Sequence, residues 1–167
     1  QLVVSGKMLG EKIHFIVIHW PSRRGGEAKS RPKRIEAAKL SKSIIDSLTV
    51  EDPNAKVILM GDFNDDPISP SIKDFLKAKM AINDVHSGEL YNTMGMHYKK
   101  GIGTLAYRDQ WNLFDQFIVT SSLLDQKKNY NDLTFYRSVI FNKPFLKNKK
   151  GNVKGYPFRT YVGSTFM

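Results

Sequence analysis

The sequence contains no cysteine, so a disulfide-stapled scaffold, a thiolate metal site and a cysteine nucleophile are all excluded. It also lacks any apolar run near the roughly 20 residues that a membrane-spanning helix needs. The 167 residues, 41% of them hydrophobic, are enough to bury a core without covalent staples. We therefore expect one folded domain. The lack of cysteine favours a secreted or periplasmic location, and nothing else in the sequence indicates the compartment.

Acidic residues are scarce, with 16 Asp and Glu against 26 Lys and Arg and a net charge of +10. Such a charge favours contact with an anion, which means nucleic acid, a phosphorylated small molecule or a membrane surface. An excess of surface lysine that keeps the protein soluble explains the same number. The five lysines within residues 143–154 fit a solvated loop better than a nucleic-acid track.

Two strands and one helix form the clearest pattern. Residues 13–18 and 56–60 are short, almost entirely apolar runs, typical of strands that are buried on both faces. Between them, residues 31–49 place apolar side chains, Leu40 among them, at helical spacing, with Ser30 as the expected N-cap. A helix between two buried strands is the crossover of a βαβ unit, so the two strands should be parallel.

The remaining elements are shorter and less regular. Residues 2–4 and 115–120 are expected to form strands, and a second helix is expected at about 70–80. Residues 81–112 are predicted to be irregular and rich in loops, while residues 133–141 fit a short helix or a strand equally well.

Polar side chains stand where the predicted strands end. His19 follows the first buried strand, and Asp62 and Asn64 follow the second. The carboxyl ends of parallel strands share one edge of a sheet, which is where open α/β sheets bind ligands. Asp115 reaches the same edge if its strand runs antiparallel to the other two. We therefore expect these side chains to surround one cleft.

A carboxylate, an amide and an imidazole at one edge suit the hydrolysis of a phosphate ester. The carboxylate orients a water or holds a cation, the amide donates a hydrogen bond, and the imidazolium stabilises negative charge. Structural roles remain as alternatives, with turn formation for Asp62 and Asn64, packing for His19, and capping for Asp115.

The residues Gly61-Asp62-Phe63-Asn64 after a hydrophobic strand resemble the GDFN/GDLN signature of the endonuclease/exonuclease/phosphatase superfamily. Two further segments match in order, IHFIVIHWPSRRGG around His19 and WNLFDQ around Asp115. The resemblance covers about residues 1–167 and is nearest to a bacterial branch of the superfamily. It implies a deoxyribonuclease I-like α/β sandwich, in which a mixed sheet carries helices on its outer face.

The resemblance also implies a role for each polar residue. His19 would contact the scissile phosphate, and Asp62 would orient the attacking water. Asn64 would bind the phosphate or the nucleophile, and Asp115 would orient the main catalytic histidine. The implied cofactor is Mg²⁺, with Mn²⁺ or Ca²⁺ as alternatives, held by Asp62 and Asn64. The implied substrate is a phosphate ester, nucleic acid included.

The sequence departs from the family pattern in two places. The Ser-Asp-His run of the family's final strand and the metal-binding Glu of its N-terminal half have no counterpart. We therefore expect residues 1–167 to be the C-terminal portion of one such domain, lacking the N-terminal half and the last strand. The chain alone should be inactive or nearly so. The missing remainder of the domain is then an expected partner.

Arginines and aromatics near the same edge are expected to bind substrate. Arg23 and Arg24 follow His19, and Tyr107 and Trp111 lie in the loop before Asp115. Arginine forks match phosphate oxygens, and aromatic rings stack on bases. Two alternatives stay open: a phosphatase or sphingomyelinase-like activity in place of a nuclease, and a non-catalytic basic module that binds nucleic acid.

Overall fold

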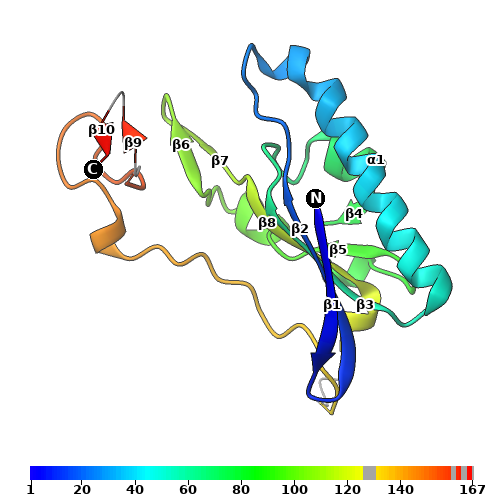
Figure 1. The fold of residues 1–167 in the computed structure, drawn as a ribbon. Coiled ribbons are helices and arrows are strands. Elements are labelled where there is room, and N and C mark those ends of the chain that lie inside the picture. Colours follow the sequence, from blue (N-terminus) through cyan, green and yellow to red (C-terminus); the bar gives the residue numbers. More distant parts are fainter. Residues whose placement is uncertain (126–130, 159–160, 163–164, 167) are drawn as a thin grey trace.

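A mixed sheet forms the centre of the computed structural model, which describes residues 1–125, 131–158, 161–162 and 165–166 (Figure 1). Its strand order is β1-β2-β3-β8-β5-β4. The bounds are β1 Leu2–Met8, β2 Glu11–His19, β3 Lys56–Asp62, β8 Asp115–Thr120, β5 Leu90–Asn92 and β4 Ala78–Lys79. Strands β2 and β3 are parallel, and β1 and β8 run antiparallel to them. The predicted α/β class with a mixed sheet is therefore confirmed.

Helix α1, Glu27–Glu51, connects β2 to β3 and lies along one face of the sheet (Figure 1). It begins four residues before the predicted start, and its N-cap is Gly26. Ser30 is therefore not the N-cap. Its hydroxyl donates to the Gly26 carbonyl at 2.8 Å, inside the first turn. Glu27 in that turn favours the earlier start because a negative charge is stabilised at a helix N-terminus.

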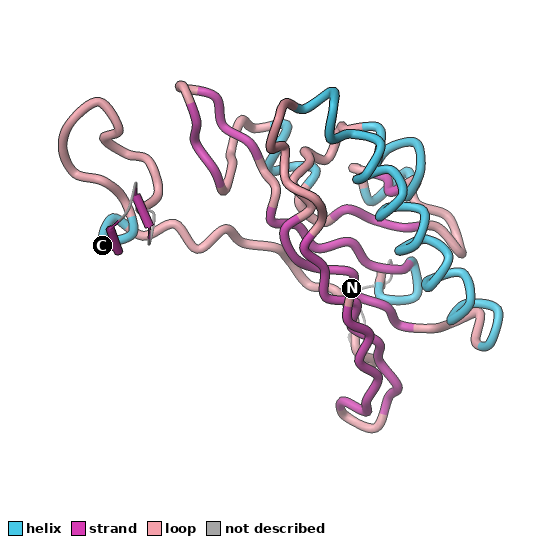
Figure 2. Tube along the Cα trace, turned by 45° about the horizontal axis from the view of Figure 1, so that its top comes forward, coloured by secondary structure: helices cyan, strands magenta, loops and turns pink. Residues whose placement is uncertain are grey.

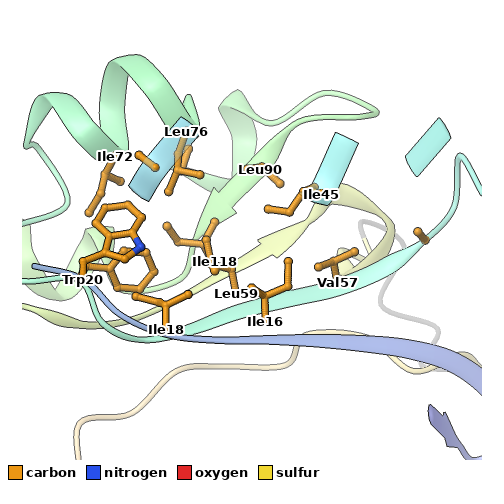
Figure 3. Close-up of a cluster of buried hydrophobic side chains, with 14 residues drawn as sticks. Ile16, Ile18, Trp20, Ile45, Val57, Leu59, Ile72, Leu76, Leu90 and Ile118 are labelled. Carbon is orange, nitrogen blue, oxygen red and sulfur yellow. The ribbon is translucent and has the colours of Figure 1, made fainter. Parts of the chain in front are cut away.

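The core lies between α1 and the sheet (Figure 3). Ile16 and Ile18 of β2 and Leu59 of β3 are buried there, with Ile45 packing against them from the helix. Alternate strand residues point to one face, so each strand contributes every second side chain to this layer. Leu40 was predicted on the inner face of the helix, but it is 53% exposed. The helix is rotated so that small and polar residues also face the sheet.

The segment between β3 and β8 is more regular than predicted. The expected second helix is a single π-helical stretch, η1, Ser71–Leu76, after which the chain enters β4. The region predicted as loop contains several short elements, namely η2 Ile82–Asp84, β5, α2 Gly95–Lys99, β6 Leu105–Tyr107 and β7 Gln110–Asn112. Strands β6 and β7 form a separate hairpin. These strands depend on pairing partners, which local sequence patterns do not reveal.

After β8 the chain runs on the side of the sheet away from α1 (Figure 2). It contains η3 Ser121–Leu123, η4 Pro144–Leu146 and the strand pair β9 Tyr161–Val162 and β10 Thr165–Phe166. Residues 133–141, which fitted helix or strand, form neither. Phe135 packs on Tyr91 with ring centroids 5.7 Å apart, and so covers part of this second face. No helix in the described ranges is both long and apolar enough to cross a bilayer.

Candidate active site

Three polar side chains stand side by side at one edge of the sheet. His19 pairs with Asp62 across β2 and β3, and Asp62 pairs with Asp115 across β3 and β8. Residues directly opposite each other in a sheet point to the same face, so the three side chains share one face. That face is the one opposite α1. The structure thus brings together the residues that strand direction alone placed at a common edge.

The imidazole of His19 and the carboxylate of Asp62 are within reach of each other. His19 Nε2 lies 3.7 Å from Asp62 Oδ2, and the two side chains are 76% and 39% exposed. A contact this open to water contributes little to stability. Both groups are therefore accessible to a ligand.

Asn64 is held by the turn that follows Asp62. Its backbone N–H donates to Asp62 Oδ1 at 2.8 Å, and its φ of 50° is left-handed, which asparagine tolerates well. The side-chain Nδ2 donates to the Trp20 carbonyl at 2.9 Å. The amide is buried, and one of its N–H groups is thus used to fix the turn. Its predicted contact with phosphate or nucleophile stays a prediction.

Gly61 allows β3 to approach β2 closely beside this turn. Its φ is 139°, and a Cβ placed there would lie 1.9 Å from the Ile18 carbonyl oxygen. Only glycine fits such a position without moving one of the two strands. The glycine of the signature therefore has a steric reason, and it sits one residue before Asp62.

A buried ion-pair network supports the turn from behind. Asp65 is almost completely buried, and Arg34 Nε of α1 lies 2.8 Å from its Oδ1. The Ser71 hydroxyl donates to Asp65 Oδ2 at 2.6 Å. Sequence reasoning missed this network. A signal existed, because Arg34 shares the sheet-facing stripe of α1 with Ala38 and Ile45.

Asp66 connects the turn to the chain before β8. Its Oδ1 accepts the Leu113 N–H at 2.8 Å. Burial raises the pKa of the Asp66 carboxyl, and the Leu113 N–H opposes that rise. The Gln116 side chain of β8 donates to the Asp65 carbonyl at 2.6 Å. These hydrogen bonds hold the turn that follows Asp62 against the chain on either side of Asp115.

Arg23 belongs to this network as well. Its Nε donates to the Asn64 carbonyl at 2.9 Å, and its NH2 lies 3.2 Å from Asp65 Oδ1. The guanidinium carbon stands 4.5 Å from the centre of the Phe114 ring. These contacts give Arg23 a supporting position in the turn. Arg24 is exposed, and the predicted substrate contact of each arginine stays a prediction.

The β6–β7 hairpin places Tyr107 and Trp111 near this edge. Both side chains are exposed, and the Trp111 ring meets Tyr156 edge-on at 5.8 Å. The Asp115 N–H donates to the Thr104 hydroxyl at 3.4 Å, so the base of the hairpin is next to the polar row. The substrate role of the two aromatics stays a prediction.

The other three histidines lie outside the row. His14 is buried and hydrogen-bonded to Ser5 at 2.7 Å, and burial lowers its pKa. His97 is bonded to Ser138 at 3.1 Å, and His86 precedes the turn that leads into β5. The imidazole that the family pattern pairs with Asp115 is therefore not supplied by any of them.

The row offers oxygen donors of the kind that a divalent cation requires. The described residues contain no group of three or more His, Cys, Asp or Glu that could hold a metal ion. Asp62, Asp115 and the side-chain oxygen of Asn64 are nevertheless hard oxygen donors. Mg²⁺ needs only one or two protein carboxylates when it keeps its waters and binds substrate phosphate. Asp62 is a carboxylate that fits this mode, and the predicted binding of a cation by Asp62 and Asn64 stays a prediction.

Several solved structures resemble the chain. TDP2 from Caenorhabditis elegans is 15% identical with a TM-score of 0.49, over 71% of this chain and 35% of that chain. The beta hairpin deletion mutant of beta toxin from Staphylococcus aureus is 19% identical with a TM-score of 0.49, over 96% and 55%. A beta toxin structure with bound magnesium ions is 18% identical with a TM-score of 0.43, over 72% and 41%.

The chain thus spans about half or less of the length of each of these structures. No curated protein matches it. The model of the endonuclease/exonuclease/phosphatase family, however, matches residues 1–167. With that match over its whole length, and with the signature turn standing at the edge of a mixed α/β sheet, the chain belongs to the endonuclease/exonuclease/phosphatase family.

Proposed function

We propose that the residues of this chain serve a divalent-metal-dependent phosphoester hydrolase that attacks its substrate with water. The observation that carries the proposal is the row of His19, Asp62 and Asp115 at neighbouring register positions of β2, β3 and β8. An imidazole beside an exposed carboxylate at a sheet edge can bind a phosphate and position a water beside it. Family membership supports the same class of reaction.

Each side chain has a defined task in this proposal. Asp62 orients the attacking water and accepts its proton, because its Oδ2 is exposed while its Oδ1 is held by the turn. His19, as the imidazolium, stabilises the charge that develops on the phosphoryl oxygens. Asn64, in the same turn, binds the phosphate or the nucleophile, and Asp115 orients a further imidazole. A bound Mg²⁺ would polarise the phosphate and lower the pKa of water.

We also propose that this chain is one portion of a larger catalytic domain and has little activity alone. General acid–base catalysis is worth about 10²–10⁴-fold, and the row as described has no imidazole paired with Asp115. Strong phosphodiesterase turnover by the isolated chain, lost in Asp62→Ala, would overturn this part of the proposal while supporting the hydrolase.

The experiment that tests the site does not depend on turnover. The ¹⁵N-labelled chain is titrated with Mg²⁺ in the presence of dimethyl phosphate. We expect shifts at the His19 ring and at the Asp62 and Asp115 amides, and we expect Asp62→Asn to abolish them. Asp46→Asn, an exposed aspartate of α1 paired with Lys42, should leave them unchanged. A titration without response at the row contradicts the proposal.

One observation favours a second candidate, a non-catalytic module that binds nucleic acid. From Leu133 to the last residue the sequence contains no Asp or Glu, while five lysines lie within residues 143–154. Such a stretch attracts polyanions in a salt-dependent way. In that case Lys→Glu reversals in residues 143–154 abolish binding of an oligonucleotide, and Asp62→Asn has no effect on it.

A further inference from the structure

Two buried amide side chains lie against each other on the face of the sheet opposite the polar row. Asn92 ends β5 and Gln116 is the second residue of β8, and both are almost completely buried. Asn92 Nδ2 donates to Gln116 Oε1 at 2.6 Å. Figure 1 shows β5 beside β8 in the sheet. Burying amides is costly unless their polar atoms are bonded, so the partners of this pair indicate what it does.

The Gln116 end of the pair holds the signature turn, residues 61–66. Gln116 Nε2 donates to the Asp65 carbonyl at 2.6 Å and to the Leu113 carbonyl at 2.9 Å. A carbonyl only accepts hydrogen bonds, so the Gln116 atom that faces both of them must be the nitrogen. Both N–H groups of one amide therefore connect the turn that presents Asp62 to the chain just before Asp115.

The Asn92 end of the pair is set by a backbone donor. The Met94 N–H donates to Asn92 Oδ1 at 3.0 Å. The Asn92 atom that faces an N–H must be the oxygen, which turns the Asn92 nitrogen toward Gln116. The Gln116 oxygen then faces Asn92, and its nitrogen faces the two carbonyls. The direction of hydrogen bonding is thus the same whether it is derived from Met94 or from the turn.

Backbone bonds between β5 and β8 fix Asn92 in place. Asn92 stands opposite Ile118 in the register of the two strands. The Thr93 N–H and the Thr93 hydroxyl both donate to the Phe117 carbonyl at 3.0 Å. The orientation of the amide pair is therefore imposed by β5, which contributes no residue to the polar row.

We propose that Asn92 is a positioning residue for the row of His19, Asp62 and Asp115. It orients the Gln116 amide, and that amide sets the signature turn against the start of β8. The inference rests on the proposed function, which requires the Asp62 and Asp115 side chains at a set separation. Neither amide touches a reacting group, so Asn92 acts on the row only through Gln116.

Asn92→Asp tests the pair with a change of nearly equal size. The new carboxylate still accepts the Met94 N–H but has no hydrogen to donate to Gln116, so two acceptors face each other in a buried place. We expect the Gln116 side-chain amide signals in ¹⁵N–¹H spectra to shift and to exchange faster with water. The Asn64 amide, which donates to Asp62 Oδ1, should also shift before any ligand is added.

The titration with Mg²⁺ and dimethyl phosphate is then repeated on the variants. We expect Asn92→Asp to weaken the apparent affinity at the row about tenfold, as the loss of an outer partner of a ligand does. Gln116→Glu removes the donors to both carbonyls and should lose at least as much. Asn92→Ala, which introduces no charge, leaves Gln116 without the group that orients it and should give a smaller loss. It replaces Asn92→Asp if that variant does not fold.

Leu90→Ala is the control for a merely structural effect. Leu90 lies two positions before Asn92 in β5, is buried in the same layer and has no polar group. The substitution leaves a cavity that lowers the stability, as urea denaturation measures, while both amides stay intact. In the folded protein we expect Leu90→Ala to keep the affinity of the parent at the row.

Two results would overturn the inference. One is a Leu90→Ala protein that binds as weakly as Asn92→Asp, since the effect would then follow stability. The other is an Asn92→Asp protein whose Gln116 signals shift while the affinity and the Asn64 amide stay those of the parent. Failure of the proposed function is distinct, because the parent itself would then not respond to Mg²⁺ and dimethyl phosphate. The ligand-free shift of the Asn64 amide still decides the role of Asn92 in that case.

Discussion

At the scale of single residues, the most consequential contact lies behind the site. Arg34 and Asp65 are fully buried, with their charged atoms 2.8 Å apart. Taking two charges out of water is costly, and the pair is tolerated because each charge compensates the other. Ser71 and Arg23 complete the environment of the Asp65 carboxylate. The turn that presents Asp62 therefore depends on a helix residue far from it in sequence.

Replacing Arg34 by methionine should strongly destabilise the protein. The substitution leaves a buried carboxylate without its main partner, and such a loss costs about 3–5 kcal/mol. Urea denaturation measures the free energy of unfolding. Arg31→Met is the matched control, because Arg31 pairs with Glu27 on the exposed side of the same helix. It should cost about 1 kcal/mol or less. Equal losses for both variants would contradict the importance of burial.

The sequence revealed the members of the signature turn more readily than the residues that support that turn. Asp62 and Asn64 were predicted because they follow a buried strand in a recognisable order. Arg34 was missed because a charged residue in a helical pattern is ordinarily assigned to solvent. The supporting contacts of Arg23 were missed for a related reason, since the acceptors that hold it lie in a turn more than 40 positions away.

At the scale of secondary-structure elements, the contact of β2 with β3 depends on the absence of a side chain at Gly61. Gly61→Ala places a Cβ at 1.9 Å from the Ile18 carbonyl oxygen. We expect a loss of more than about 3 kcal/mol, since backbone cannot move as a flexible side chain can. Thermal unfolding followed by circular dichroism measures it.

The control is Gly6→Ala in β1, where a Cβ has nothing within 4 Å. Alanine is favoured over glycine in a strand interior by about 0.5–1 kcal/mol, so this variant should be slightly more stable than the parent. A Gly61→Ala protein as stable as Gly6→Ala would show that the two strands can separate there. Gly61→Ala should also weaken the response of His19 and Asp62 to Mg²⁺ and dimethyl phosphate.

Elements that are long and periodic were predictable, and short ones were not. β2, α1 and β3 carry their own patterns, so their order and parallel direction followed from the sequence. β5 has three residues, and it is a strand because it pairs with β8. β6 and β7 likewise need each other and the tight turn at Arg108 and Asp109, both of which have left-handed φ values. Non-local pairing of this kind leaves no local signature.

At the scale of the whole molecule, the two faces of the sheet differ. One face is sealed by α1, and the other carries an apolar row directly below the polar one. Val17 pairs with Met60, and Met60 pairs with Phe117. Each of the three lies two positions along its strand from a member of the polar row. Leu2 extends the apolar row onto β1. The polar row therefore forms the rim of an apolar surface.

This surface should make the chain associate with itself. Phe117 and Val17 are 47% and 39% exposed, and Leu2 next to them is exposed as well. Contiguous apolar patches on a sheet face favour association, and the free edge of β1 adds unpaired backbone groups. We expect the chain to bind the dye 8-anilinonaphthalene-1-sulfonate and to increase in apparent mass with concentration, as measured by light scattering.

Threonine substitutions test the origin of that behaviour. Val17→Thr combined with Phe117→Thr removes apolar surface while keeping residues that favour strands, so the sheet should persist. Dye binding and the concentration dependence of mass should both fall by about half or more, in proportion to the apolar area removed. Val50→Thr removes a more exposed valine from the end of α1, away from the sheet face, and should leave both readings unchanged. If Val50→Thr lowered them as much as the double variant, general surface hydrophobicity would be the cause, and the sheet face would have no special part in association.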